Sequence, residues 1–217
     1  ANSHWLTTHD GLASDDARAI FEDSRGDTWI GGYGGLTRIH NGVMSRWTEA
    51  QGLPSNNVDT VMEDSAGDIW VGTYDGGIGW LRNGRWVRFN KNSGLYDNGA
   101  LQILEDAKDR FWISSNRGIY RVSRKQLSDV ADGREARADS VAYGSADGML
   151  SAECNGGFWP AGAKDAHGLL WFPTQKGVAI VDPESIPVDK EPPRIVIESA
   201  SVEHTPQNAL NKVVLHP

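Results

Sequence analysis

A stretch that begins with Glu-Asp recurs along the chain, and this internal repeat limits the possible folds more than any other feature. The first three copies carry a tryptophan at the same place, and these tryptophans (Trp29, Trp70 and Trp112) are 41 and 42 residues apart. A Gly-Leu pair begins 18 residues before each of them. Two markers that keep one register indicate tandem copies of a single structural unit.

A fourth, looser copy follows the first three. Gly148 stands at the place of the repeated glycine, and Trp171 lies 59 residues after the third tryptophan. We interpret part of the excess, the polar residues 123–140, as an inserted loop with room for a turn or two of helix at 127–137. The rest of the excess falls in residues 151–162.

Each copy carries four short strand signals separated by turn residues. In the second copy we expect strands at 58–62, 69–73, 77–81 and 85–89. The Asn83-Gly84 pair between the last two is a strong hairpin signal, because both residues tolerate positive φ. Four strands in about 40–45 residues is the pattern of a propeller blade. We therefore predict an all-β fold of four four-stranded β-propeller blades, with the repeated tryptophans wedged between neighbouring blades.

Composition and motifs exclude several function classes. The chain has 217 residues and a net charge of -8, whereas binders of nucleic acid or anionic membranes normally show a basic face. Its one cysteine, Cys154, cannot form a disulfide within the chain or a cysteine-based metal site. The histidines are scattered, and no nucleophile or phosphate-loop motif is present. We expect no cofactor, no metal site, no nucleic-acid partner and no catalytic residues.

The repeat resembles a known family. The strings GLPSNNV at 52–58 and EDSAGDIWVGT at 63–73 are similar to the two-component regulator propeller repeat. The three best copies cover about residues 11–122. The fourth copy, with DGMLSAECNGG at 147–157, resembles the usual last blade of such sensors.

The end of the chain resembles a second domain of the same sensors. The string PPRIVIESASVE at 192–203 is similar to the first strands of the immunoglobulin-like Y_Y_Y domain, a β-sandwich that follows the propeller. We therefore predict propeller blades over 1–186, and a linker with the start of the Y_Y_Y domain over 187–217. The linker proper would be 189–193, whose two prolines suit a stiff junction.

The resemblance implies the extracytoplasmic, periplasmic part of a bacterial receptor anchored in the inner membrane. The output would be a histidine kinase, a hybrid kinase or a diguanylate cyclase outside these residues, so the chain itself is expected not to be an enzyme. The ligand would be an oligosaccharide or another small molecule, and the full receptor a homodimer. Family propellers usually have seven blades, so the four found here would be part of a larger ring, completed by the remaining blades or by a second copy of the chain.

Two sets of residues are candidates for ligand binding. Residues 151–162 break the repeat, and they supply a carboxylate, an amide and an aromatic face that suit a sugar. The turns between the second and third strands share one rim of the blades, where Tyr33 is a further exposed residue. The candidates are Glu153, Asn155 and Trp159 from the first set, and Tyr74, Asp75, Asn116 and Arg117 from the second.

Alternative interpretations stay open for the residues and for the function. Residues 151–162 are also explained as the ordinary connection into the last blade, with Trp159 in the core, and the turn residues as exposed surface. A propeller that binds proteins without a small ligand is the main alternative function. A propeller enzyme similar to the streptogramin lyases is another, although the sequence offers no well-placed catalytic histidine.

Overall fold

The computed structural model describes residues 4–186, 200–202 and 205–207, and the chain divides into two compact units, 1–184 and 185–217. Sequence analysis placed the boundary after residue 186. In the second unit, β16 (Ala200–Val202) and β17 (Thr205–Gln207) form an antiparallel pair. The expected linker at 189–193 and most of the expected Y_Y_Y strands lie outside the described residues, so the Y_Y_Y domain stays a prediction.

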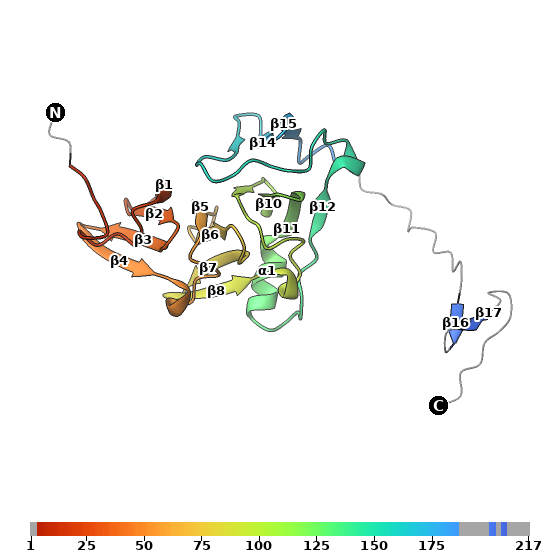
Figure 1. The fold of residues 1–217 in the computed structure, drawn as a ribbon, viewed down its shortest axis with the longest axis horizontal. Helices are drawn as coiled ribbons and strands as arrows, with labels where there is room; N and C mark the ends of the chain where they lie inside the picture. Colours follow the sequence, from red (N-terminus) through yellow and green to blue (C-terminus); the bar gives the residue numbers. More distant parts are fainter. Residues whose placement is uncertain (1–3, 187–199, 203–204, 208–217) are drawn as a thin grey trace. The chain divides into compact units, whose positions relative to one another are not determined.

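The first unit consists of propeller blades, as predicted (Figure 1). Each blade is an antiparallel sheet whose strands are neighbours in chain order. The first blade comprises β1 (Ala17–Glu22), β2 (Thr28–Gly32), β3 (Gly35–His40) and β4 (Val43–Trp47). The second comprises β5 (Val58–Glu63), β6 (Ile69–Thr73), β7 (Ile78–Arg82) and β8 (Arg85–Phe89), close to the expected bounds.

The third and fourth blades depart from the predicted pattern. The third comprises β9 (Gln102–Glu105), β10 (Arg110–Ser115), β11 (Gly118–Ser123) and β12 (Val141–Tyr143). The fourth has three strands within the described residues, not the predicted four: β13 (Ala163–Lys164), β14 (Leu170–Thr174) and β15 (Gly177–Val181). The fourth blade therefore lacks an outer strand in this part of the chain.

The inserted loop of the third blade is more ordered than predicted. It begins with helix α1 (Arg124–Ala131), which starts three residues before the expected helical turn. The helix buries Leu127 completely against the core between the second and third blades. This apolar contact explains why a stretch that reads as polar forms a helix.

The repeated Gly-Leu pair is explained by a turn between blades. Short 3₁₀ turns at Glu49–Gln51 and Lys91–Ser93 end at Gly52 and Gly94, whose φ angles are 100° and 103°. Only glycine adopts this left-handed conformation without strain, which fixes its place in the repeat. The leucine that follows each glycine is buried, so the turn also anchors the chain as it enters the next blade.

Each repeated tryptophan is held by an aspartate six residues earlier. In the second blade, the Trp70 indole N–H donates to Asp64 Oδ2 at 2.9 Å. Asp64 Oδ1 accepts the backbone N–H groups of Ala66 and Asp68, both at 2.9 Å, and so closes the turn between β5 and β6. The same three bonds recur in the other blades. The pairs there are Asp23 with Trp29, Asp106 with Trp112 and Asp165 with Trp171.

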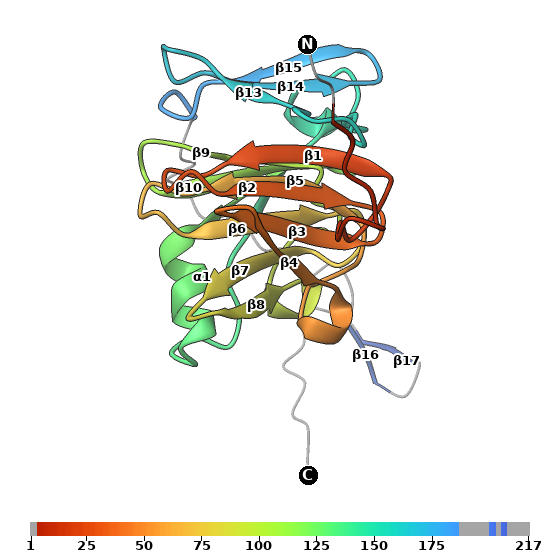
Figure 2. The ribbon, with the colours of Figure 1, turned by 90° about the vertical axis from the view of Figure 1, so that its left-hand side faces the viewer.

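The first three repeated tryptophans are buried, as predicted for wedges between blades. Trp70 stacks on Trp80 of its own sheet, with ring centroids 5.1 Å apart, and meets Phe111 of the next blade edge-on at 4.8 Å. The first strands of the first three blades, β1, β5 and β9, are spatial neighbours (Figure 2).

In the described part of the chain, no helix is long and apolar enough to cross a membrane.

We predict that Trp70→Ala lowers the free energy of unfolding by about 3–5 kcal/mol, because it leaves a cavity between two blades. Trp171→Ala is the matched control, since Trp171 makes the same aspartate bond but its residue is 36% exposed, against 0% for Trp70. We expect a clearly smaller loss for the control. Urea denaturation measures both, and equal losses would contradict the role of Trp70 as a wedge.

Candidate functional site

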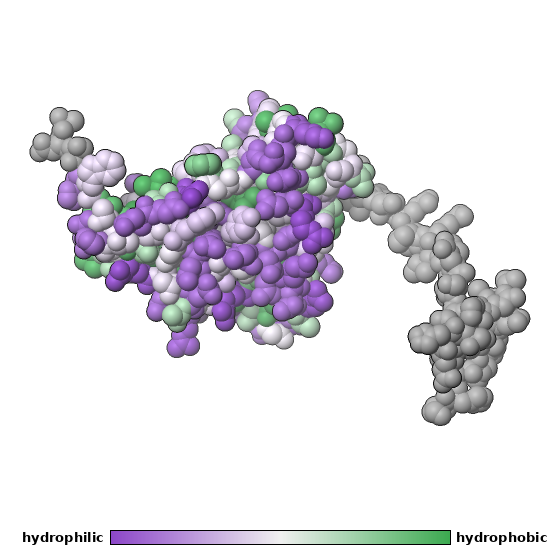
Figure 3. Space-filling view, in the orientation of Figure 1, coloured by the Kyte–Doolittle hydropathy of each residue, from purple (hydrophilic) through white to green (hydrophobic). Residues whose placement is uncertain are grey.

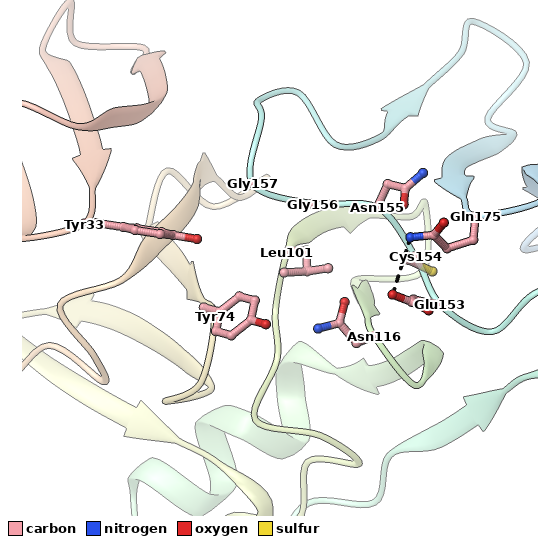
Figure 4. Close-up of a pocket in the computed structure, with 10 residues that line it drawn as sticks. All are labelled: Tyr33, Tyr74, Leu101, Asn116, Glu153, Cys154, Asn155, Gly156, Gly157 and Gln175. Carbon is pink, nitrogen blue, oxygen red and sulfur yellow. Dashed lines mark hydrogen bonds between the residues drawn. The ribbon is translucent and has the colours of Figure 1, made fainter.

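A cavity opens at the end of the blades where the second strand turns into the third (Figure 4). Each blade contributes the residue four positions after its repeated tryptophan. These residues are Tyr33, Tyr74, Asn116 and Gln175. Because the blades repeat one geometry, equivalent turn positions gather around one rim and point side chains into one space.

The segment that enters the fourth blade forms another wall of the cavity. Glu153, Cys154 and Asn155 line it, and their backbone is tied to two blades. The Cys154 N–H donates to the Ser115 carbonyl at 3.2 Å, and the Asn155 N–H donates to the Pro173 carbonyl at 2.9 Å. These bonds position the polar side chains of this segment opposite the tyrosines.

The cavity has a volume of about 270 Å³ and a polar lining. Glu153 is the one charged residue among those that line it, and its Oε1 accepts a bond from Gln175 Nε2 at 3.4 Å. Leu101, Gly156 and Gly157 complete the wall. Two phenol rings, three amides and one carboxylate suit hydroxyl groups and the apolar face of a small ring.

Four of the seven predicted site residues line this cavity, and three do not. Glu153, Asn155, Tyr74 and Asn116 lie on its wall, as does Tyr33. The other three are Asp75, Arg117 and Trp159.

The other three candidates have different surroundings. Arg117 points away toward Asp97, with Nε 3.6 Å from the carboxylate, and Asp75 is an exposed turn residue outside the wall. Trp159 is partly buried and packs against the core between the first and second blades. This position is closer to the alternative that sequence analysis left open than to a place on the cavity wall.

Sequence analysis missed Gln175, Cys154 and Leu101. The signal for Gln175 was present, since it stands in the same register after Trp171 as Tyr74 does after Trp70. Leu101 stands in the register of Arg18 and Asp59, 11 residues before its tryptophan, whereas Cys154 carried no signal from the repeat. Their place on the wall depends on how the irregular segment crosses the blades.

A buried aspartate, Asp59, lies close to these residues. It sits at an irregularity of β5, where the pairing with β6 shifts register between Val58 and Thr60. Its side chain is 3% exposed, and neither carboxylate oxygen has a hydrogen-bond partner. Burial raises the pKa of Asp59 to about 6, Arg18 opposes this rise and Asp75 adds to it.

The cavity is lined by one thiol, that of Cys154. Burial raises the pKa of the Cys154 thiol to about 11, so the thiol stays protonated at neutral pH and is a poor nucleophile. No histidine lines the cavity. In the described residues, no cluster of three or more His, Cys, Asp or Glu side chains is placed to hold a metal ion.

We predict that Asp59→Asn gains stability relative to the wild type as the pH rises from about 4 to about 8. The pKa of Asp59 is about 6 in the folded state and about 3.8 in the unfolded state. The contribution of Asp59 to the free energy of unfolding of the wild type is therefore fully present below pH 3.8 and is lost as the pH rises through about 6. A difference of about two between these pKa values corresponds to about 3 kcal/mol. Urea denaturation across this range measures the change. A flat difference for Asp59→Asn would contradict a raised pKa.

The chain resembles solved extracellular domains in its fold. The extracellular domain of BT3049 from B. thetaiotaomicron, described as a hybrid two component system, is 23% identical with a TM-score of 0.68. The match covers 84% of this chain and 24% of that one. The extracellular domain of BT4673 from the same organism is 22% identical with a TM-score of 0.67, and 82% and 25% of the two chains are covered.

A propeller enzyme is a more distant structural relative. A catalytically inactive virginiamycin B lyase from Staphylococcus aureus is 17% identical with a TM-score of 0.53, over 82% of this chain and 57% of the lyase. At these identities the comparisons establish the fold. The comparison with curated proteins gives no match.

The family comparison identifies the repeat itself. The description of the matching family is "Two component regulator propeller", and the matched residues are 11–34 and 52–75, the first two repeats. The chain spans about a quarter of the length of the extracellular domains that it resembles. It is therefore a set of β-propeller blades whose first two repeats match the two-component regulator propeller.

Proposed function

We propose that this chain is the ligand-sensing region of a bacterial signal-transduction receptor, and that its cavity binds a small oligosaccharide. The observation that carries the proposal is the convergence of one turn position from all four blades on a single cavity. A repeat needs only turn-forming residues there, yet the four positions hold two tyrosines, an asparagine and a glutamine.

The relatives support a sensor that lies outside the cytoplasm. Both solved neighbours from B. thetaiotaomicron are extracellular domains of proteins described as hybrid two component systems. By analogy, we place this region in the periplasm, as part of an inner-membrane protein, with a kinase or cyclase output elsewhere in the receptor. The resemblance also implies that the full receptor works as a homodimer.

The cavity supports a sugar ligand through its mixture of groups. Amide and carboxylate side chains bond to hydroxyl groups, and the rings of Tyr33 and Tyr74 offer flat faces for apolar sugar surfaces. The volume of about 270 Å³ holds a monosaccharide or a disaccharide end better than a long chain. A longer oligosaccharide would extend along the rim of turns.

We also propose that further blades of the same kind complete the ring, because both outer faces of this set are uncovered. Ile20 is 58% exposed, whereas Val61 and Ile103 at the same place in the next two blades are 1% exposed. At the opposite end, Val178 is 58% exposed, whereas Leu36 at the same place in the first blade is fully buried. Figure 3 shows hydrophobic residues at the edge formed by β14 and β15.

The polar contacts between blades support the same proposal. Ser24 donates to Glu63 of the next blade through its backbone N–H and its hydroxyl, both at 2.7 Å. Ser65 repeats this contact with Glu105, at 2.6 and 3.1 Å. Glu22 stands at the corresponding place in the first blade, so a preceding blade with a serine in its turn would bond to it.

We predict that Asn116→Ala weakens oligosaccharide binding about 3- to 10-fold, the effect of losing one neutral hydrogen bond. Arg117→Ala is the matched control from the same turn, because Arg117 points toward Asp97 and not into the cavity. Calorimetry with oligosaccharide pools from plant and microbial polysaccharides measures both variants. Equal losses, or no binding by the wild type to any pool, would contradict the proposed site.

We predict that the isolated chain self-associates through its uncovered blade faces. In a solution of the chain alone, a second copy is the one molecule that can supply a blade to cover these faces. Val178→Lys should raise the dissociation constant by about tenfold or more, because it places a charge in an apolar contact. Val43→Lys is the control, since Val43 is 66% exposed on the outer strand β4. Sedimentation velocity measures the association, and a monomer at every concentration would contradict the assignment of these faces.

A further inference from the structure

Asp59 is an exception among the buried aspartates of the blades. Asp23, Asp64 and Asp106 are also buried, but each accepts two backbone N–H groups and one indole N–H. Asp59 accepts none, and both of its oxygens are shielded from solvent. A buried carboxylate without a partner destabilises a fold, so no structural contact in the described residues explains this one.

The backbone at Asp59 departs from regular strand geometry, and this departure changes the direction of the Asp59 side chain. The register shift between Val58 and Thr60 is the mark of a β-bulge, which re-aims the extra residue. The first blade has the same bulge, and Arg18 is the extra residue there. In the third blade the equivalent position is Leu101, which lines the cavity.

Of the three residues at this position, Leu101 lines the cavity, whereas Arg18 and Asp59 lie outside its lining. Arg18 Nη1 donates to the carbonyl of Gly157, a residue of the cavity wall, at 3.0 Å. The Arg18 guanidinium also lies 4.5 Å from the centre of the Tyr33 ring. Burial raises the pKa of the Tyr33 phenol, and the negative charge of Asp59 adds to this rise.

The charges around this position favour a cation in the cavity. Arg18 is the basic group that faces Asp59, but it is committed to Asp16, with Nε and Nη2 each 2.8 Å from the carboxylate oxygens. Asp75 adds a second negative charge near Asp59, and Glu153 adds a third on the far wall. The nearby acids thus outnumber the bases, and an anionic sugar such as a uronate would be repelled.

We propose that the cavity selects a sugar that carries a free, protonated amine, and that Asp59 is the acceptor for that amine. This inference rests on the proposed function and adds the ligand class. An ammonium group supplies three N–H donors to a carboxylate that has none. The rings of Tyr33 and Tyr74, which are 41% and 47% exposed, would swing to admit it and then hold it by cation–π contact.

The test compares three disaccharides that differ mainly at the second carbon of each sugar ring. They are the β-1,4 glucosamine disaccharide with free amines, its N-acetylated form and cellobiose. We expect calorimetry near neutral pH to show that the free-amine form binds the wild type about tenfold or more tightly than either neutral form, as for a charge-assisted hydrogen bond. Asp59→Asn should remove this preference, so that the three disaccharides bind the variant with similar affinities.

Control variants separate Asp59 from the general negative potential of the cavity. Glu153→Gln and Asp75→Asn should each keep most of the preference for the amine. If either variant abolishes the preference while Asp59→Asn keeps it, the assignment of Asp59 is wrong. Because Asp59 makes no hydrogen bond, we expect Asp59→Asn to fold, with a melting temperature at or above that of the wild type.

A measurement on the wild type alone covers the case in which Asp59→Asn does not fold. The preference for the amine should fall as the pH drops through about 6, where Asp59 becomes protonated while the amine keeps its charge. A preference that stays constant would overturn the proposal. Binding of cellobiose with no preference for the amine, or binding of none of the three, would overturn this inference. The sugar sensor itself is overturned only if the wild type also binds none of the oligosaccharide pools.

Discussion

The bond between an aspartate and an indole six residues later is the interaction on which the rest of this structure depends. One carboxylate closes the turn between the first two strands of a blade and fixes the tryptophan that follows, as Asp64 does for Trp70. Local turn geometry and packing between blades are therefore set by the same side chain. Each blade can then present an identical wedge to its neighbour, and a short repeat builds a rigid stack.

The candidate site is a consequence of this stacking. Because every blade has the same shape, the turn four residues after the tryptophan always reaches the same rim, and variation at that position costs the fold little. Tyr74 and Asn116 occupy it without contributing to the core between the blades. The repeat therefore separates residues that hold the fold from residues that are free to bind, and Asp59 is the one buried carboxylate of the blades that this division leaves unexplained.

Much of the fold could be predicted from the sequence because it is encoded locally and then repeated. The Asn83-Gly84 turn has positive φ at both residues, as its hairpin signal predicts, and the strands of the second blade end within a residue of their expected bounds. Helix α1 was harder to predict, because it forms through Leu127, which is buried in the core between the second and third blades. Half of the candidate site could be predicted for the same reason, because Tyr74 and Asn116 occupy equivalent positions of the repeat. The surroundings of Trp159 could not be predicted, because Trp159 has no equivalent position in the other repeats.

The sequence by itself determined the unit: its four strands, its glycine turns and the tryptophan that joins one copy to the next. Each of these depends on backbone conformation or on residues a few positions apart. Only the tertiary structure decided which side chains share a cavity, that Trp159 packs against the core, and that Asp59 is buried without a partner. Those properties depend on contacts between segments that are far apart in the sequence, such as the contact between Arg18 and Gly157. A local sequence pattern does not indicate which distant segments come into contact.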